Sequence, residues 1–302
     1  MLFRSQRATL ATEGRSAGIE VPIGARPRPE GVGAVGEESV AAQMIDQGLA
    51  GHRAIVLPTG SIWADRDGEV TVRAMDLFLV RHGQPDWTPD RIARNDPDLT
   101  DLGHEQAKRV ALHLGNGEEF DELWVSTMRR ALQTSAPVSS EIGAEPEAYA
   151  WLQEIQNPPT WDGSPADEIE KALREANFRS MDEMWDGLPG GESFRDFHLR
   201  VVTGLEETLA ANGIRPMHEK HRHLWQVEDP GKRVVIVAHA GTNAVVLGRL
   251  LGLEPVPWEW ERFRQPHTGV SRLTMARIST GWGFSLRQLG DVSHLEEAMV
   301  TQ

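Results

Sequence analysis

The sequence predicts an α/β fold in which a mostly parallel central sheet carries helices on both faces. Three short apolar runs, at residues 77–80, 123–125 and 234–237, are typical of buried strands, and each changes abruptly to polar residues at its end. From residue 76 onward, segments of strand character alternate with segments of helical periodicity. Such alternation indicates parallel strands joined by helical crossovers, which cover both faces of the sheet.

Periodicity and turn chemistry predict the remaining elements. Prolines favour a loop after the first strand, and Thr100 can cap the helix that follows this loop. The longest predicted helix carries its apolar residues along one stripe. In chain order we expect a loop at 84–98, a helix at 101–114, a strand at 123–125, a helix at 128–142, a strand at 148–152, an irregular excursion at 157–190, a helix at 192–211, a polar connection at 213–232, a strand at 234–237, a helix at 242–251, and strands at 270–276 and 282–286.

Residues 1–75 differ in composition from the rest and are predicted to form an N-terminal extension. Residues 1–35 are rich in Gly, Arg, Ala and Pro without periodicity, so we expect them to be flexible. Residues 38–74 have the composition of a short helix, a strand and a hairpin, the hairpin at 61–73. The domain that carries the chemistry is predicted at residues 76–297.

Composition excludes several classes of protein. The net charge of −14 on 302 residues argues against a nucleic acid or an anionic membrane as the main partner. The chain has no cysteine, which excludes disulfides, thiolate metal sites and a cysteine nucleophile. No apolar run is long enough to span a membrane, and the N-terminus lacks the apolar core of a signal peptide, so we expect a cytoplasmic protein.

Cationic and imidazole side chains follow the apolar runs. The first run ends in Arg81 and His82, the second leads to Arg130, and the third ends before His239. In open α/β sheets, ligands bind at the carboxyl ends of the strands. Two arginines and two histidines gathered there predict a site for a dense anion, most simply a phosphoryl group.

These residues belong to a series of spaced motifs that resembles the histidine phosphatase superfamily, also called phosphoglycerate-mutase-like, over residues 76–297. Several motifs in the family's order are more specific than any one alone. They are Arg81-His82-Gly83-Gln84, Leu99-Thr100-Asp101-Leu102-Gly103 with Gln106-Ala107, the run from Ser126 to Thr134, Leu152-Gln153-Glu154-Ile155, Trp161-Asp162-Gly163, Pro189-Gly190-Gly191-Glu192-Ser193, Ala238-His239-Ala240-Gly241 and Asp291-Val292-Ser293-His294-Leu295.

The resemblance implies that His82 is a nucleophile that becomes phosphorylated. A histidine attacks only when neutral, and neighbouring arginines should disfavour its protonated form. Arg81, Arg130 and His239 would donate hydrogen bonds to the oxygens of the transferring group, where charge accumulates. Glu154, after a strand, matches the family's acid, which protonates the leaving oxygen and then deprotonates the attacking water.

The resemblance also implies substrate contacts from Gly83, Gln84, Thr88 and Ala240. Thr88 stands where many relatives carry asparagine, so its shorter hydroxyl makes this contact the least secure. Each assignment has an ordinary structural alternative, namely a core or capping histidine, a surface arginine in an ion pair, or a glutamate that happens to follow a strand.

No metal and no other cofactor is expected to take part in the reaction, because arginines supply the charge and no carboxylate cluster surrounds the motif. His218, His221 and His223, with Glu219 among them, invite a metal-site interpretation. Their spacing does not match a closed zinc pattern and their neighbours are highly charged, so a solvated loop is favoured.

The favoured function is hydrolysis of a phosphomonoester on a small phosphorylated metabolite. The alternatives are a mutase, which returns the phosphoryl group to its substrate, and a non-catalytic phosphate-binding module. Family mutases follow their glutamate with Arg-His-Tyr, whereas Glu154 is followed by Ile155-Gln156-Asn157-Pro158-Pro159. Residues 155–191 also carry a net charge of −5, from three basic and eight acidic residues, which suits a phosphoglycerate carboxylate poorly. The sequence leaves the oligomeric state open, a homo-oligomer included.

Overall fold

The computed structural model describes most of the chain from residue 62 onward. The described residues are 62–64, 70–72, 75–176, 178–217, 224–228 and 231–302. The expectations for residues 1–61 and for His218, His221 and His223 lie outside them. Strands β1 (Ile62–Ala64) and β2 (Val70–Val72) pair antiparallel within the segment for which a hairpin is predicted.

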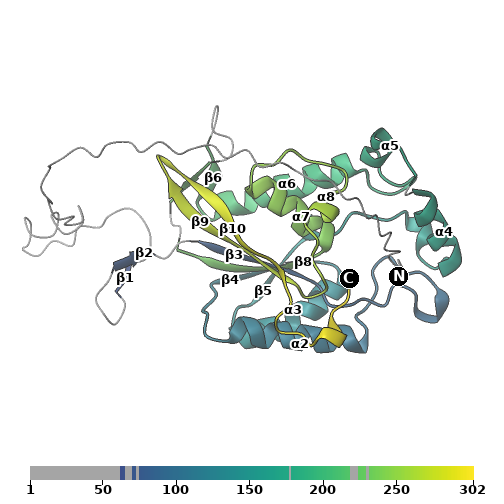
Figure 1. Ribbon diagram of the computed structural model, residues 1–302, viewed down its shortest axis with the longest axis horizontal. Coiled ribbons are helices and arrows are strands. Elements are labelled where there is room, and N and C mark those ends of the chain that lie inside the picture. Colours follow the sequence, from purple (N-terminus) through teal and green to yellow (C-terminus); the bar gives the residue numbers. More distant parts are fainter. Residues whose placement is uncertain (1–61, 65–69, 73–74, 177, 218–223, 229–230) are drawn as a thin grey trace, which may run out of the picture. The chain divides into compact units, whose positions relative to one another are not determined.

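An eight-stranded mixed sheet forms the centre of the domain, with the strand order β5-β4-β8-β3-β9-β10-β7-β6 (Figure 1). In the half from β5 to β3, neighbouring strands pair parallel. From the pairing of β3 with β9 onward, neighbouring strands pair antiparallel. The parallel strands are β3 (Asp76–Arg81), β4 (Glu122–Ser126), β5 (Pro146–Tyr149) and β8 (Arg233–Ala238). The antiparallel strands are β6 (Ile214–Pro216), β7 (Trp225–Val227), β9 (Val270–Ile278) and β10 (Gly281–Asp291).

The α/β fold with helices on both faces is confirmed, but the sheet is mixed where a mostly parallel one was expected. The connection between β9 and β10 explains the difference. Only Ser279 and Thr280 separate the two strands, and Ser279 has a φ of 53°, as in a tight hairpin turn. Two residues cannot make the crossover that a parallel pair needs, so the C-terminal strands must run antiparallel.

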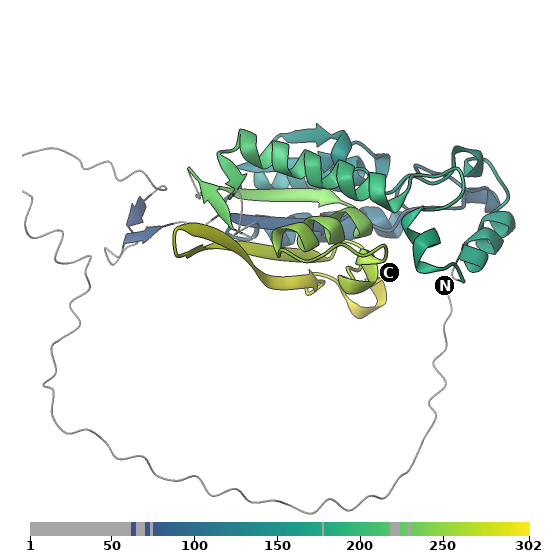
Figure 2. The ribbon, with the colours of Figure 1, turned by 90° about the horizontal axis from the view of Figure 1, so that it is seen from above.

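Helices α2 (Asp101–Gly115) and α3 (Arg129–Ile142) cover one face of the sheet, and α6 (Phe194–Ala211) and α7 (Ala240–Leu250) cover the other (Figures 1 and 2). Thr100 caps α2 as predicted, since its hydroxyl accepts from Gly103 N at 3.0 Å. Two buried apolar clusters lie on the two faces of the sheet. On the α2 and α3 face the cluster includes Val80, Val110, Val125 and Ala131; on the α6 and α7 face it includes Leu79, Phe197, Leu205 and Val245.

The excursion at 157–190 is not irregular throughout, because it holds α4 (Ala166–Ala176) and α5 (Met181–Trp185). Helix α5 begins with a capping box, in which Ser180 and Glu183 satisfy each other's backbone N–H groups. Both helices lie beyond the carboxyl ends of the parallel strands (Figures 1 and 2). Helix α8 (Glu259–Arg262) and short 3-10 turns at Pro89–Arg91, Ala150–Leu152, Pro159–Trp161 and Glu297–Met299 complete the described elements. Within this part of the chain, no helix is both long and apolar enough to cross a membrane.

Candidate active site

The turn after β3 places His82 at the carboxyl edge of the sheet. Arg81 pairs with Ala238 in the parallel ladder, and His82 N donates to Ala238 O at 2.9 Å, so His82 and His239 emerge side by side. Their ring centroids lie 5.0 Å apart. Gly83 must lack a side chain, because a Cβ atom would lie 2.5 Å from the carbonyl oxygen of Gly103 at the start of α2.

The hydrogen bonds of His82 determine its tautomer. Nδ1 lies 2.7 Å from the carbonyl oxygen of Gly83, which can only accept, so Nδ1 carries the proton. Nε2 lies 3.2 Å from Nε of Arg130, which can only donate. The lone pair of Nε2 therefore points at the guanidinium of Arg130, and the ring is neutral.

Arg130, in the first turn of α3, is one of the largest fully buried side chains and is 1% exposed. Besides His82, its guanidinium contacts the Sδ atom of Met128 at 3.3 Å and Oδ1 of Asp96 at 3.4 Å. Its Cζ atom lies 4.8 Å from the ring centre of Trp87, a cation–π contact. Burial lowers the pKa of Arg130 to about 10, and the carboxylates of Glu154 and Asp96 oppose this effect, so the side chain stays charged at neutral pH.

Arg81 is held from the other side of the site. Nη1 donates to the carbonyl oxygen of Gln265 at 2.7 Å, and Nη2 to Nε2 of His267 at 3.0 Å. His267 in turn lies 2.8 Å from the hydroxyl of Thr301 through Nδ1. The Nε atom of Arg81 is buried and has no partner among the described residues, so it remains available to an anion.

His239, the N-cap residue of α7, is fully buried. Its Nε2 lies 2.8 Å from the hydroxyl of Ser126, which already accepts from Met128 N at 3.3 Å and so is free to donate. When the Ser126 hydroxyl donates to Nε2, the proton of His239 lies on Nδ1, a buried atom with no partner among the described residues. An unpaired donor of this kind is costly unless a ligand accepts from it.

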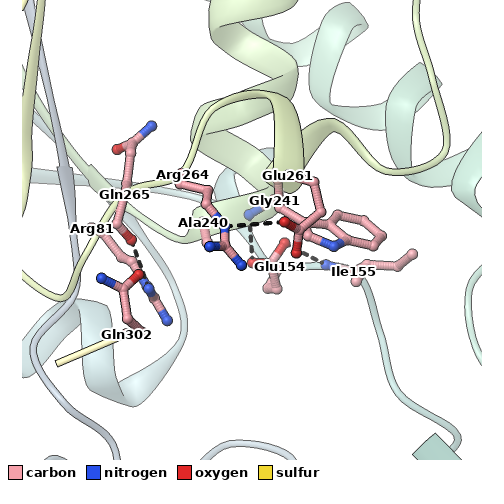
Figure 3. A pocket seen from close by; sticks show the side chains of 10 residues that line it. Arg81, Glu154, Ile155, Ala240, Gly241, Glu261, Arg264, Gln265 and Gln302 are labelled. Atoms are coloured by element: carbon pink, nitrogen blue, oxygen red, sulfur yellow. Dashed lines mark hydrogen bonds and ion pairs between the residues drawn. The ribbon is translucent and has the colours of Figure 1, made fainter. Parts of the chain in front are cut away.

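Glu154 is fixed by two backbone N–H groups, as Figure 3 shows. Oε1 accepts from Ile155 N at 3.1 Å and Oε2 from Gly241 N at 2.9 Å, at the positive end of α7. Gly241 is needed here because a Cβ atom would collide with a carboxylate oxygen of Glu154. Burial lowers the pKa of Arg81 to about 10, and the nearby Glu154 carboxylate opposes this effect, as it does for Arg130.

Burial and cations keep the histidines of the site neutral. Burial lowers the pKa of His82 well below 6.5, and Arg130, His239, Arg81 and His267 lower it further. Burial and then the nearby arginines do the same to the pKa of His239. Burial, followed by Arg81, lowers the pKa of His267 to about 3. The site is therefore positive through its arginines alone, which suits an incoming anion.

The four remaining predicted contact residues have different surroundings. Gly83 shapes the turn, and its N–H donates to Thr134 Oγ1 at 3.0 Å. The Gln84 side chain accepts from the hydroxyl of Thr100, the N-cap residue of α2, at 2.8 Å. Thr88 is exposed and makes no capping hydrogen bond, while Ala240 lines the cavity beside Arg81 and Glu154.

The cavity at this site has a volume of about 300 Å³. Its lining combines cations, carboxylates and an indole: Arg81, Glu154, Ile155, Ala240, Gly241, Trp260, Glu261, Arg264, Gln265 and Gln302 (Figure 3). Among the described residues, the cluster of His, Asp and Glu that could hold a metal ion is His113, Asp291 and His294, none of which lines this cavity.

Sequence reasoning missed the residues that support the site, chiefly Trp87, Asp96, Ser126, Gln265 and His267. Ser126 begins the motif that runs to Thr134, and it could have been recognised as the polar residue that ends β4. His267 and Gln265 precede β9 and had no local signal, because their partner Arg81 lies more than 180 residues earlier.

Comparison with known proteins agrees with this geometry. The model of the histidine phosphatase superfamily (branch 1) matches residues 77–284. Phosphoglycerate mutase-like protein 4 of Arabidopsis thaliana is 27% identical over 227 residues, which cover 74% of this chain and 87% of that protein. The glucosyl-3-phosphoglycerate phosphatase of Mycolicibacterium vanbaalenii is 28% identical over 190 residues, 62% of this chain and 79% of that protein.

A solved structure shares the fold. The native mycobacterial glucosyl-3-phosphoglycerate phosphatase superimposes with a TM-score of 0.55 at 23% identity, covering 73% of this chain and all of that one. The family match spans the three strand ends that carry His82, Arg130 and His239. The chain belongs to branch 1 of the histidine phosphatase superfamily.

Proposed function

We propose that the protein hydrolyses phosphomonoesters through a phosphohistidine formed on His82. The observation that carries this proposal is the Nε2 lone pair of a buried, neutral His82, held among cationic and neutral N–H donors. Curated relatives include both mutases and phosphatases, so the family alone leaves the choice between them open.

In the first step, the Nε2 atom of His82 attacks phosphorus and the ester P–O bond breaks. Arg130 turns its Nε–H from the histidine to a phosphoryl oxygen, and Arg81 and Nδ1–H of His239 donate to the others. These donors stabilise the charge on the oxygens of the transferring group without first having to be ordered. Protonated Glu154 gives its proton to the leaving oxygen, which departs as an alcohol.

In the second step, Glu154 is a carboxylate and removes a proton from water. The resulting hydroxide attacks phosphorus, the N–P bond breaks, and inorganic phosphate leaves a neutral His82. The N–H groups of Ile155 and Gly241 hold the Glu154 carboxylate in place for this proton transfer.

A second cavity supports hydrolysis over mutase chemistry. It has a volume of about 450 Å³, shares Ile155 and Trp260 with the first, and is lined mainly by apolar groups from the excursion and its neighbours. Met184 and Leu188 line it, whereas Phe178 and Met181 face solvent. Such a cavity suits an organic leaving group larger than glycerate, and it offers Arg174 and Arg179 as its basic residues.

The test compares wild-type protein with His82→Ala and His82→Asn. Phosphate release from a panel of phosphorylated metabolites should be lost in both variants, together with acid-labile, base-stable phosphate on the protein. A phosphate-competition assay should still detect anion binding, since Arg81 and His239 remain. Turnover of His82→Ala at the wild-type rate would refute the mechanism.

A parallel assay separates the two reaction types. Interconversion of 2- and 3-phosphoglycerate is measured beside hydrolysis of each monoester in the panel. Hydrolysis should exceed interconversion; a faster interconversion than every hydrolysis would assign the protein to the mutases.

A further inference from the structure

A second cluster of ligating side chains lies outside the active site. His113 lies in the last turn of α2, Asp291 ends β10, and His294 follows three residues later. Each offers one ligand atom, and these atoms lie within 4.8 Å of one another. His113 Nε2 is 3.9 Å from Asp291 Oδ2, and the two imidazole centroids are 5.2 Å apart.

The tautomer of His294 follows from its neighbour Thr268. The Thr268 hydroxyl has one proton, which it donates to the carbonyl oxygen of His267 at 2.8 Å. Towards Nε2 of His294, 3.2 Å away, this hydroxyl can therefore only accept. The tautomer with the proton on Nε2 satisfies this contact together with the hydrogen bond to His267, and in that tautomer Nδ1 carries a lone pair.

That lone pair is buried and has no hydrogen-bond partner among the described residues. Leaving a buried acceptor unpaired costs free energy, so the arrangement calls for a cation or a donor at this point. One ring nitrogen hydrogen-bonded to an oxygen and the other bare is the arrangement of a metal-ligating histidine.

We propose that His113, Asp291 and His294 bind a divalent transition-metal ion of the zinc or cobalt type. Two imidazoles and one carboxylate suit these ions, whereas calcium and magnesium prefer oxygen ligands alone. Tetrahedral zinc separates its ligand atoms by about 3.3 Å, so each side chain must move by roughly 1 Å or less. Ser293 Oγ already donates to Asp291 Oδ2 at 2.8 Å and orients that carboxylate.

The ion ties the segment after β10 to the last turn of α2. Through His294 it also lies close to Thr268, in the loop behind His82. Thr268 N donates to the carbonyl oxygens of Arg81 at 3.0 Å and His82 at 3.3 Å. The ion fixes His294, which holds the hydroxyl of the same threonine. The site is therefore structural, takes no part in the phosphoryl transfer, and does not depend on which reaction the active site performs.

The experiment uses the full chain, stripped with EDTA and dialysed into metal-free buffer. Zinc chloride is titrated by calorimetry, Tm is measured with and without zinc, and cobalt(II) is followed by visible absorption. The variants are His113→Gln and Asp291→Asn, whose side chains are 36% and 22% exposed, so folding should be retained. His294→Ala is avoided at first because it also removes the hydrogen bond to Thr268.

Wild-type protein should bind one zinc equivalent at this site, with a rise in Tm and a cobalt absorption band. Loss of an outer-sphere partner alone costs about 10–100-fold in metal affinity, so loss of a ligand should weaken zinc binding at least that much. His104→Gln, an exposed histidine on the same helix, is the matched control and should bind as wild type.

Three outcomes would overturn the proposal. In the first, the wild-type chain binds no zinc. In the second, His113→Gln keeps the zinc affinity and the Tm response of the wild type. In the third, zinc binding is lost only when His218, His221 and His223 are replaced together by alanine.

Discussion

Acid should destabilise this protein because its site histidines are buried in the neutral form. The pKa values of His82 and His239 lie well below 6.5, and that of His267 is about 3. In the unfolded chain the same groups titrate at their ordinary value near 6.5. Below that pH the unfolded state binds protons that the native state does not, so the free energy of unfolding falls as pH falls.

The size of the effect follows from this linkage. Between pH 7.5 and 5.0, one histidine that stays neutral in the native state lowers the free energy of unfolding by about 2 kcal/mol. His267, whose pKa is about 3, contributes this amount, and His82 and His239 act in the same direction. Even one such contribution is a large part of the roughly 5–15 kcal/mol that stabilises an ordinary domain. His294 is not counted because it is partly exposed and solvent reduces its contribution.

The assay is urea unfolding, followed by tryptophan fluorescence at pH 7.5 and 5.0. His267→Gln removes one titrating group, so its difference between the two pH values should be about 2 kcal/mol smaller than that of the wild type. His104→Gln, an exposed position on α2, should keep the wild-type difference. Equal stability of the wild-type chain at both pH values, or a full-sized difference in His267→Gln, would refute the argument.

Three further predictions concern the site and its surroundings. Treatment with EDTA should leave kcat for phosphate release unchanged, because arginines supply the charge; loss of activity restored by one divalent ion would contradict this. Deleting residues 1–35 should leave the rate on a small phosphoester and Tm nearly unchanged, and a large fall in both would show that this segment is structural. Gly241→Ala should lower kcat about 100-fold by displacing Glu154, while the circular dichroism spectrum stays that of the native protein. Gly248→Ala is the control on the same helix, because a Cβ atom there would lie 3.4 Å from its nearest neighbour and should displace nothing.

The parts of the fold that depend on local pattern could be predicted from the sequence. The apolar runs at β3, β4 and β8 are buried strands, and the helix capped by Thr100 begins where its motif indicates. The ends of β3, β4 and β8 bring His82, Arg130 and His239 close together. Glu154 is held beside them by its hydrogen bond from Gly241 N, at the start of α7. This succeeded because each of these residues follows directly from an element whose direction the chain order determines.

The remaining features depend on contacts between distant segments. The hairpin of β9 and β10 was read as two separate strands, so the antiparallel half of the sheet was missed. The short edge strands β6 and β7 fall in a segment predicted as a polar connection, because three residues show no periodicity. Gln84 is predicted to contact substrate, and in the structure its side-chain oxygen accepts from Thr100, a pairing that local sequence does not reveal.

The contact between Arg130 and His82 has a consequence for which reagents the protein accepts. At rest the lone pair of the nucleophile is occupied by a guanidinium N–H, 3.2 Å away. On the mechanism proposed above, an incoming phosphoryl group brings strong anionic acceptors that can draw this N–H aside and expose the lone pair of His82. An alkylating agent such as an alkyl halide brings no comparable acceptor, so we expect the resting contact between Arg130 and His82 to slow its reaction with the histidine.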